Sequence, residues 1–243
     1  MKDFLQDLIS HVHTLGVLPV VKVDATGDTV TLTSVSDDKN LIFNAKTHTN
    51  INGLQGIFGL SNFHTLDLHL KCPEYRENSK ISLMMDNRNN QYIPVGIHFE
   101  NEHGDYKNYF KFIPSVIIDQ KVKAVEINIP SWDVEFQPTI NNIQRFKLQS
   151  SVHTDEKLFH LLTKDNNLIV KFGDDVYDSG EFVLQPNISC NINPDWLWSK
   201  SAVLSALSLD GDKFVKITNK GALQITVDSG IAEYNYIFRP VVK

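Results

Sequence analysis

The order of the predicted elements limits this chain to a small set of folds. Strand-like runs come in two groups with turns between neighbours, at residues 20–24, 29–35 and 41–45 and then at residues 66–71, 81–85, 92–99 and 108–113. Neighbouring strands joined by short turns pair antiparallel, whereas parallel strands need long crossover connections. The sequence therefore predicts an α+β protein with antiparallel sheets and excludes a parallel α/β core.

Helical periodicity occurs at a few places between these runs. Residues 3–14 put Phe4, Leu8 and Val12 on one face, with Asp3 as a cap and an end at Gly16. In the second half, residues 138–152 predict a helix with Ile140, Ile143 and Phe146 inward, and residues 195–209 predict another, capped by Asp195, with Leu197, Val203, Leu204 and Leu207 on its buried side. The remaining strand-like runs are 132–136, 158–162, 168–172, 182–184, 214–218, 223–227 and 234–238.

The stretch 50–65, NINGLQGIFGLSNFHT, holds three glycines with a spacing of three. A phosphate-binding P-loop needs a Gly-Lys-Ser/Thr ending, and here Leu60 and Ser61 follow the last glycine. The dinucleotide fingerprint needs a different glycine spacing. The apolar residues follow a helical period instead, so the stretch is predicted to be a short helix that packs closely through Gly53, Gly56 and Gly59.

Size and charge suit two similar domains. The 243 residues are enough for two domains of ordinary size, and residues 1–118 and 119–243 each carry a net charge of −3. The whole chain carries −6, which argues against a protein that coats nucleic acid through overall charge. The two cysteines, Cys72 and Cys190, lie far apart, and there is neither a long apolar run nor a signal-peptide pattern. We therefore expect a cytoplasmic protein that does not contact a membrane.

The sequence gives no positive support for an enzyme. His11 and His13 lie two apart on a helix and point to different sides, so they do not predict a metal site. The Asp174–Asp175 and Asp210–Asp212 pairs resemble magnesium-binding carboxylates, but Gly-Asp at the end of an element is ordinary turn chemistry. No nucleophile, base and oxyanion donor come together, and neither a metal nor any other cofactor is expected.

Charge is distributed unevenly between helices and strands. Residues 137–154 contain Arg145, Lys147 and His153 and no acidic residue. The four predicted helices, with Lys2 counted in the first, together carry +1, so the rest of the chain carries −7. A helix face that carries this small excess of positive charge favours contact with DNA phosphates, although it is also what a solvated face looks like.

Two matching halves of helices among strands resemble the sliding clamps of DNA replication, most closely those of tailed bacteriophages. Ile51 to Leu60 looks like the Leu-Asn-Gly-x-x-Gly-Ile segment at the second helix of those clamps. The run from Pro130 to Phe136 looks like the opening of their second domain. Tyr234 to Val241 resembles the aromatic-then-proline tail of cellular clamps.

The resemblance implies a DNA-clamp fold of two similar domains, each with antiparallel sheets on the outside and two helices lining the inner face. The domains would be residues 1–116 and 131–243, with a connector at 117–130. Such clamps are homotrimeric rings around double-stranded DNA. A clamp loader places them on DNA, where they tether the DNA polymerase without reading sequence. Matching positions give Lys2, His13, Arg145, Lys147 and Lys200 for DNA, and Ile117, Ile118, Val122, Phe238, Pro240 and Val241 for a partner pocket.

Two other readings remain open from the sequence. One is a β-rich virion structural or receptor-binding protein, a class in which acidic antiparallel domains are common. Two of the three tryptophans, Trp196 and Trp198, fall on a predicted helix, which is poor support for a carbohydrate-binding surface. The other is a metal-dependent nuclease that uses Asp174 and Asp175.

Overall fold

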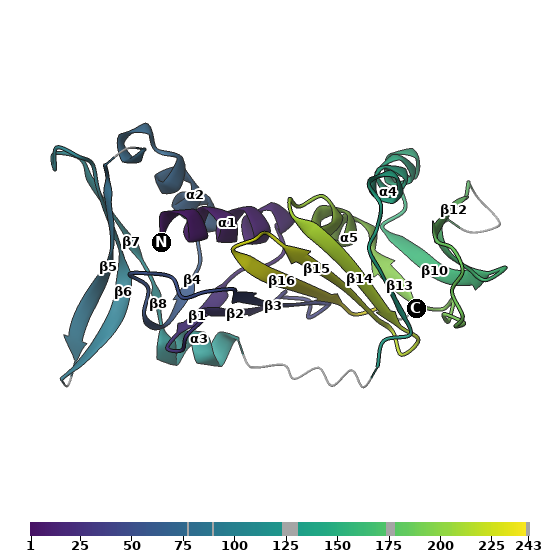
Figure 1. The fold of residues 1–243 in the computed structure, drawn as a ribbon, viewed down its shortest axis with the longest axis horizontal. Coiled ribbons are helices and arrows are strands. Elements are labelled where there is room, and N and C mark those ends of the chain that lie inside the picture. The colour runs from purple at the N-terminus through teal and green to yellow at the C-terminus, as the bar shows by residue number, and fades with distance from the viewer. Residues whose placement is uncertain (77, 89, 123–130, 174–177, 242–243) are drawn as a thin grey trace. The chain divides into compact units, whose positions relative to one another are not determined.

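The computed structural model divides the chain into two compact units (Figure 1). Residues 77, 89, 123–130, 174–177 and 242–243 lie outside the described structure. Unit 1 consists of residues 1–37, 43–125 and 229–234, and unit 2 of residues 38–42, 126–228 and 235–243. Each unit therefore includes a short piece of chain from the other half of the sequence. The predicted boundaries at 116 and 131 remain predictions.

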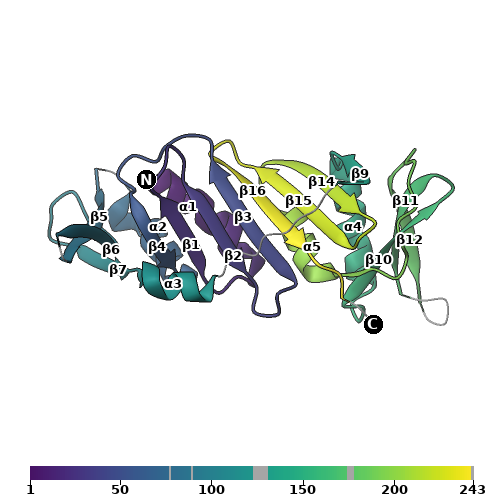
Figure 2. The same cartoon turned by 90° about the horizontal axis from the view of Figure 1, so that it is seen from below.

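Unit 1 combines short helices with two antiparallel sheets. The helices are α1 (Lys2–Val12), η1 (His13–Leu15), α2 (Phe63–Lys71), η2 (Pro73–Tyr75) and α3 (Ser115–Lys121). Five strands lie in the order β8 (Ile113–Pro114), β4 (Gly56–Leu60), β1 (Val21–Ala25), β2 (Thr31–Val35) and β3 (Leu41–Thr47). A separate sheet contains β5 (Lys80–Arg88), β6 (Gln91–Glu100) and β7 (Lys107–Lys111). Figure 2 shows α3 on the opposite side of the first sheet from α1 and α2.

Unit 2 repeats this arrangement. Its helices are α4 (Ile140–Val152) and α5 (Lys200–Leu207). One sheet has the order β16 (Ala232–Phe238), β15 (Ala222–Asp228), β14 (Asp212–Thr218) and β9 (Val134–Phe136). The other has the order β12 (Gly180–Gln185), β11 (Asn167–Phe172), β10 (Leu158–Lys164) and β13 (Leu197–Ser199). The predicted α+β class with antiparallel sheets is confirmed.

The pairing scheme matches closely between the units. In unit 1 the strand before the second helix, β4, pairs with the first strand after α1, and in unit 2 β13 pairs with β10 in the same way. Next to β4 lies the short strand β8, and next to β13 lies Val241, which forms a bridge with Leu197. The strand β9 pairs with β14, and among the described residues β5 has no such neighbour. The units are therefore a repeat in which one strand lacks a counterpart.

The helix predicted for residues 3–14 is confirmed as α1. Phe4, Leu8 and Val12 are all buried on one face. Asp3 is not the cap, because the helix begins at Lys2 and Met1 occupies the cap position. The chain then tightens into η1 and turns at Gly16, which adopts φ = 67°.

The helix predicted for residues 50–65 is wrong. Residues 56–60 form the strand β4, and α2 begins only at Phe63. The glycines still allow close packing, because a Cβ on Gly59 would lie 2.8 Å from the Ile118 side chain on α3. Gly53 and Gly56 adopt φ values of +79° and +86°. The pattern came from a turn and a strand that must contact other elements closely.

Two further predictions confused helix with strand. Residues 66–71 belong to α2 rather than to a strand, with Leu66 and Leu70 buried and Leu68 56% exposed. The helix predicted from Asp195 begins only at Lys200, because residues 197–199 form β13, and Ser199 rather than Asp195 accepts the capping hydrogen bond from Ala202. Trp198 is fully buried in this strand. Burial of the bulky residues from a sheet position outweighed the helical pattern here.

The C-terminal hairpin supplies a segment of unit 1. His48 N donates to the Ile231 carbonyl at 3.0 Å, which fixes residues 229–234 beside β3. In unit 2, Arg239 N donates to the Asn40 carbonyl at 2.8 Å, so residues 38–42 join that unit in the same way. Each unit is completed by chain that is remote in sequence.

Candidate DNA-facing helices and partner surface

The helix α4 is held by one aromatic residue. Thr139 Oγ1 accepts from Asn142 N at 3.1 Å and begins the helix. Phe146 is 1% exposed and packs edge-on against Phe159 and Phe172, with ring centroids 5.0 and 5.5 Å apart. Only Phe146 and Ser150 of this helix are buried. The rest of α4 is therefore available to whatever faces it.

Arg145 and Lys147 are both exposed on α4. Residues 137–154 contain no acidic side chain, and within the described part of the chain neither cation forms an ion pair. Two exposed cations without an acidic neighbour on the helix give this face a local excess of positive charge on a protein whose net charge is −6, and DNA contact by them stays a prediction.

Apolar side chains share the exposed surface of α4. Ile140 is 77%, Leu148 63% and Val152 70% exposed. The prediction that Ile140 points inward is wrong, because the helix begins there and its first turn extends past the core. The exposed surface of α4 therefore combines two cations with three apolar groups.

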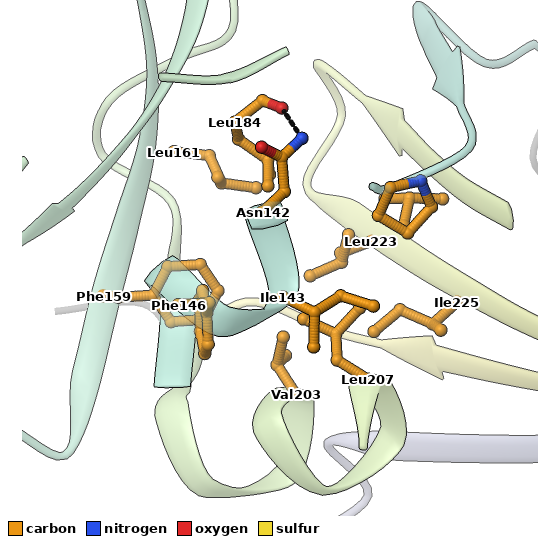
Figure 3. Close-up of a pocket in the computed structure, with 12 residues that line it drawn as sticks. Asn142, Ile143, Phe146, Phe159, Leu161, Leu184, Val203, Leu207, Leu223 and Ile225 are labelled. Atoms are coloured by element: carbon orange, nitrogen blue, oxygen red, sulfur yellow. Dashed lines mark hydrogen bonds between the residues drawn. The ribbon is translucent and has the colours of Figure 1, made fainter. Parts of the chain in front are cut away.

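A small cavity lies beneath α4 (Figure 3). Its volume is ≈ 20 Å³, about enough for a single water molecule. Phe146, Val203 and Ile225 are among its apolar lining residues. The one amide in the lining, Asn142, is already satisfied, because its Nδ2 donates to the Leu184 carbonyl at 2.6 Å. The cavity is a packing gap rather than a ligand site.

Lys200 has a structural contact. Its Nζ donates to the Ser150 carbonyl at 3.1 Å and to the His153 carbonyl. A cation here satisfies carbonyls that the end of α4 leaves without a partner. Lys200 is thus partly engaged in joining α5 to α4, while its role in DNA contact stays a prediction.

The candidates in unit 1 are similarly mixed. Lys2 Nζ donates to the carbonyls of Tyr75 and Arg76, the second at 3.4 Å, which connects the start of α1 to the segment before β5. His13 is half-buried, and its ring centroid lies 6.0 Å from that of His64 on α2. Sequence reasoning missed His64 because that stretch was assigned to the glycine helix. DNA contact by Lys2 and His13 stays a prediction.

The predicted partner residues on α3 differ in exposure. Ile118 is fully buried and Val122 is 5% exposed, so both belong to the core of unit 1. Ile117 is 46% and Val116 is 70% exposed. Residues 115–121 are helical, so the predicted connector at 117–130 begins within a helix, and residues 123–130 lie outside the described structure. An apolar contact from α3 can therefore come only from Val116 and Ile117.

The C-terminal candidates lie in unit 2. Phe238 is 2% exposed, whereas Pro240 and Val241 are half-buried. Val241 N donates to the Leu197 carbonyl at 2.8 Å, so the tail continues the sheet at β13. Phe238 is core, and the other two have some free surface.

A polar cluster in unit 1 joins α1 to the C-terminal hairpin. Tyr234 Oη donates to Asp7 Oδ2 at 2.7 Å, and Ser229 Oγ donates to the same oxygen at 2.8 Å. His11 stacks on Tyr234 with centroids 4.2 Å apart. Burial raises the pKa of the Asp7 carboxyl, but the hydrogen bonds from His11, Tyr234 and Ser229 outweigh burial and lower it overall.

Nothing among the described residues forms a metal centre. No group of three or more His, Cys, Asp or Glu side chains comes together there. His11 is buried against Tyr234, away from any site it could form with His13. Asp174 and Asp175 lie outside the described residues, and Asp210 and Asp212 flank the turn at Gly211. Likewise, no described helix is both long and apolar enough to cross a bilayer.

Helices over antiparallel sheets, repeated in two units, define the DNA-clamp fold. The chain is similar along its whole length to PCNA of A. fulgidus, in a structure with the C-terminal region of FEN-1 bound, at a TM-score of 0.68 and 10% identity over 100% of this chain and 97% of that one. It is also similar to PCNA of Thermococcus kodakaraensis, at a TM-score of 0.65 and 12% identity over 99% and 97%.

At these identities the likeness establishes the fold. No family model matches the sequence, and no curated protein matches it. The predicted clamp fold is confirmed, and the bacteriophage type stays a prediction.

Proposed function

We propose that this protein is a sliding clamp that encircles double-stranded DNA and tethers a replicative DNA polymerase for processive synthesis. The observation that carries this proposal is the clamp fold, which extends over the whole of the given chain. Such a protein is a binding scaffold rather than an enzyme. The same proposal includes a clamp loader that places the protein on DNA. It also includes a location in the cytoplasm of a bacterium that is the host of a bacteriophage.

The DNA contact we propose is weak and sequence-independent. Arg145 and Lys147 supply exposed positive charge on α4, and the remaining exposed face offers apolar groups. A ring holds DNA topologically, so a few phosphate contacts are sufficient and still permit sliding. This accounts for DNA binding by a chain of net charge −6.

Ring closure follows from the internal repeat. β3 and β12 are each the third strand after the first helix of their unit, and β16 and β7 are each the third strand after the second helix. In the repeat, β3 therefore corresponds to β12 and β16 corresponds to β7. His48, directly after β3, donates its backbone N–H to the carbonyl of Ile231, directly before β16. By the same rule β7 of one copy pairs with β12 of the next, since both are edge strands among the described residues. Three two-unit copies then close a homotrimer.

Polymerase tethering is assigned to the exposed part of α3 and to the half-buried tail. Ile117→Asp should weaken tethering at least fivefold, because it places charge on an exposed apolar contact, while the fold stays intact. Ile118 is not suitable for this test, because a charge in its fully buried position will unfold unit 1. Unchanged processivity with Ile117→Asp would remove α3 from the proposal.

The decisive experiment compares retention on circular and linear DNA. After loading by the cognate clamp loader onto a nicked plasmid, the protein should stay bound through gel filtration and be lost when the plasmid is linearised. The double variant Arg145→Glu with Lys147→Glu should load less and dissociate at lower salt. Lys220→Glu, an exposed charge reversal in a turn, serves as the matched control. Equal retention on linear DNA, or a stable monomer at working concentration, would reject the ring.

A further inference from the structure

The strand β5 is the edge of its sheet, and on its outer side no further strand is found among the described residues. Its nine residues, Lys80–Arg88, pair only with β6 among the described residues. The central residues Ile81, Leu83, Met84 and Met85 are all half-buried. A long edge with apolar residues in the middle readily accepts another strand.

The counterpart of β5 in the repeat is covered. In unit 2, β14 pairs with β15 on one side and with β9 on the other. Val215 and Ile217, which lie opposite β9, are 4% and 0% exposed. Lys216 forms an ion pair with Glu135 of β9 at 3.3 Å. The strand β9 therefore shows what kind of segment this edge accepts: apolar, acidic, apolar, as in Val134-Glu135-Phe136.

The direction of the backbone groups on β5 follows from one hydrogen bond. Phe112 N donates to the Val95 carbonyl at 3.0 Å, so Val95 faces β7. The β5–β6 register shifts at Val95, but the ladder between β6 and β7 is regular from Gly96 to Glu100, so Ile97 also faces β7 and Gly96 and His98 face β5. Met84 and Ser82 lie opposite them and face inward. Ile81 and Leu83, which lie between, therefore present their N–H and C=O groups to the open edge.

Ring closure would leave this edge open. The proposed ring uses β7 and β12, and β5 is the opposite edge of the sheet that contains β7. The Lys80 side chain at the start of the strand is 74% exposed and lies 3.7 Å from the carboxylate of Glu100 on β6, so it adds a cation that is already partly neutralised. The inference rests on the repeat and goes beyond the clamp function.

We propose that the free edge of β5 binds an extended segment of a partner protein by adding an antiparallel strand. The segment has apolar residues at alternate positions with an acidic residue between them. Backbone hydrogen bonds to Ile81 and Leu83 provide the pairing. The half-buried apolar side chains of β5 favour a segment whose apolar residues stand at alternate positions. A peptide of this type would take the place that β9 has on β14.

The test uses the chain's own covering strand as the probe. A fluorescent peptide of residues 131–137, SWDVEFQ, should bind the full-length protein with saturable 1:1 anisotropy. Two versions carry N-methyl groups on alternate amides. One version should bind at least tenfold more weakly and the other should be unaffected, because only one set of amides faces the edge. Equal binding by both versions, or no saturable binding, overturns the proposal.

Matched variants separate the backbone from the side chain. Leu83→Pro removes an outward N–H without removing a hydrogen bond to β6. It should therefore weaken binding of the peptide at least tenfold. Leu83→Ala also loses the leucine side chain but keeps the N–H. Its affinity for the peptide should stay within threefold of the wild-type affinity. Melting curves of both variants show whether each is folded, and equal weakening by the two contradicts strand addition.

A fusion of the covering strand to the protein itself provides an independent test. The start of α1 is held next to the segment before β5, through Lys2 and the carbonyls of Tyr75 and Arg76. Residues 131–139 fused ahead of Met1 should therefore cover β5 and abolish peptide binding. Mass photometry of the same samples reports ring assembly separately, so failure of either idea is distinguishable. A dimer that Leu83→Pro dissociates would make a second copy the occupant and overturn the proposal.

Discussion

At the scale of single residues, Asp7 links parts of unit 1 that are far apart in sequence. Its carboxylate receives hydrogen bonds from Ser229 and Tyr234, more than two hundred residues away along the chain. The side chain is only 11% exposed. A largely buried carboxylate with several donors stabilises the fold only while it is ionised.

Asp7→Asn should lower the free energy of unfolding at pH 7 by about 1–3 kcal/mol, because the amide is a weaker acceptor for those donors. The pKa of Asp7 is below its usual value in the folded state. Its contribution is therefore present above a pH of about 4 and is lost as the pH falls through the folded pKa. Urea unfolding at pH 7 and pH 3 measures both values.

The difference between the wild type and Asp7→Asn should shrink at the lower pH. Asp3→Asn, on the exposed face of the same helix, should change stability little at either pH. An equal difference at pH 7 and pH 3 would contradict the role of the ionised carboxylate.

Gly59 shows a second requirement at this scale. A Cβ there would lie 2.8 Å from Ile118 and 2.9 Å from Ile113 Cβ. Gly59→Ala should destabilise the protein by about 1–3 kcal/mol, because this contact is already close-packed. Thermal unfolding tests this, with Gly27→Ala as the control, since its nearest atom would be 3.9 Å away. Trimming the neighbour with Ile118→Val should recover part of the loss; if it does not, the cause is not this contact.

At the scale of elements, α4 is held by few buried residues, and a small cavity remains beneath it. Phe146 provides most of the buried contact of the helix, and the cavity beside it leaves ≈ 20 Å³ unfilled. Position and rigidity of the exposed cations depend on this packing.

Val203→Ile should add a methylene to the cavity and raise the free energy of unfolding by about 1 kcal/mol. Urea unfolding midpoints provide the measurement. Val12→Ile is the matched control: Val12 is 1% exposed and does not line the cavity, so the same addition should overpack its site and destabilise. A Val203→Ile variant no more stable than the wild type would show that the gap cannot accept the added carbon.

Elements with one clear period were predictable from the sequence. The first helix, α4 and most strands lie where the patterns place them. The errors came where two periods overlap. Leu66, Leu68 and Leu70 alternate as in a strand, but Leu66 and Leu70 are also one helical turn apart, and the helix buries only those two of the three. Six residues do not distinguish these periods.

The candidate site was only partly predictable for a different reason. Exposure of Arg145 and Lys147 follows from an uncompensated polar helix face, which the sequence shows. The contacts of Lys200 and Lys2 join residues about fifty and seventy-four positions apart. No local pattern specifies which distant carbonyl a flexible lysine will reach, so those contacts required the structure.

At the scale of the whole molecule, the proposed ring depends on pairing between strand edges of neighbouring copies. Backbone alternation in β7, from the bond between Phe112 and Val95, turns Tyr109 N–H away from β6. Tyr109→Pro should therefore convert a trimer to monomers in mass photometry without removing a bond inside the subunit. Tyr109→Ala, which keeps the N–H, should remain trimeric. A trimer that tolerates the proline would place ring closure elsewhere.

The exchange of short segments between the units has a consequence for synthesis on the ribosome. Residues 229–234 complete unit 1, but they are translated after nearly all of unit 2. The first half of the nascent chain therefore cannot bury Tyr234 against Phe43 and His11 until residue 234 has emerged. A ribosome that stalls before residue 229 would hold a chain whose N-terminal half, although fully translated, exposes part of its core to chaperones and proteases.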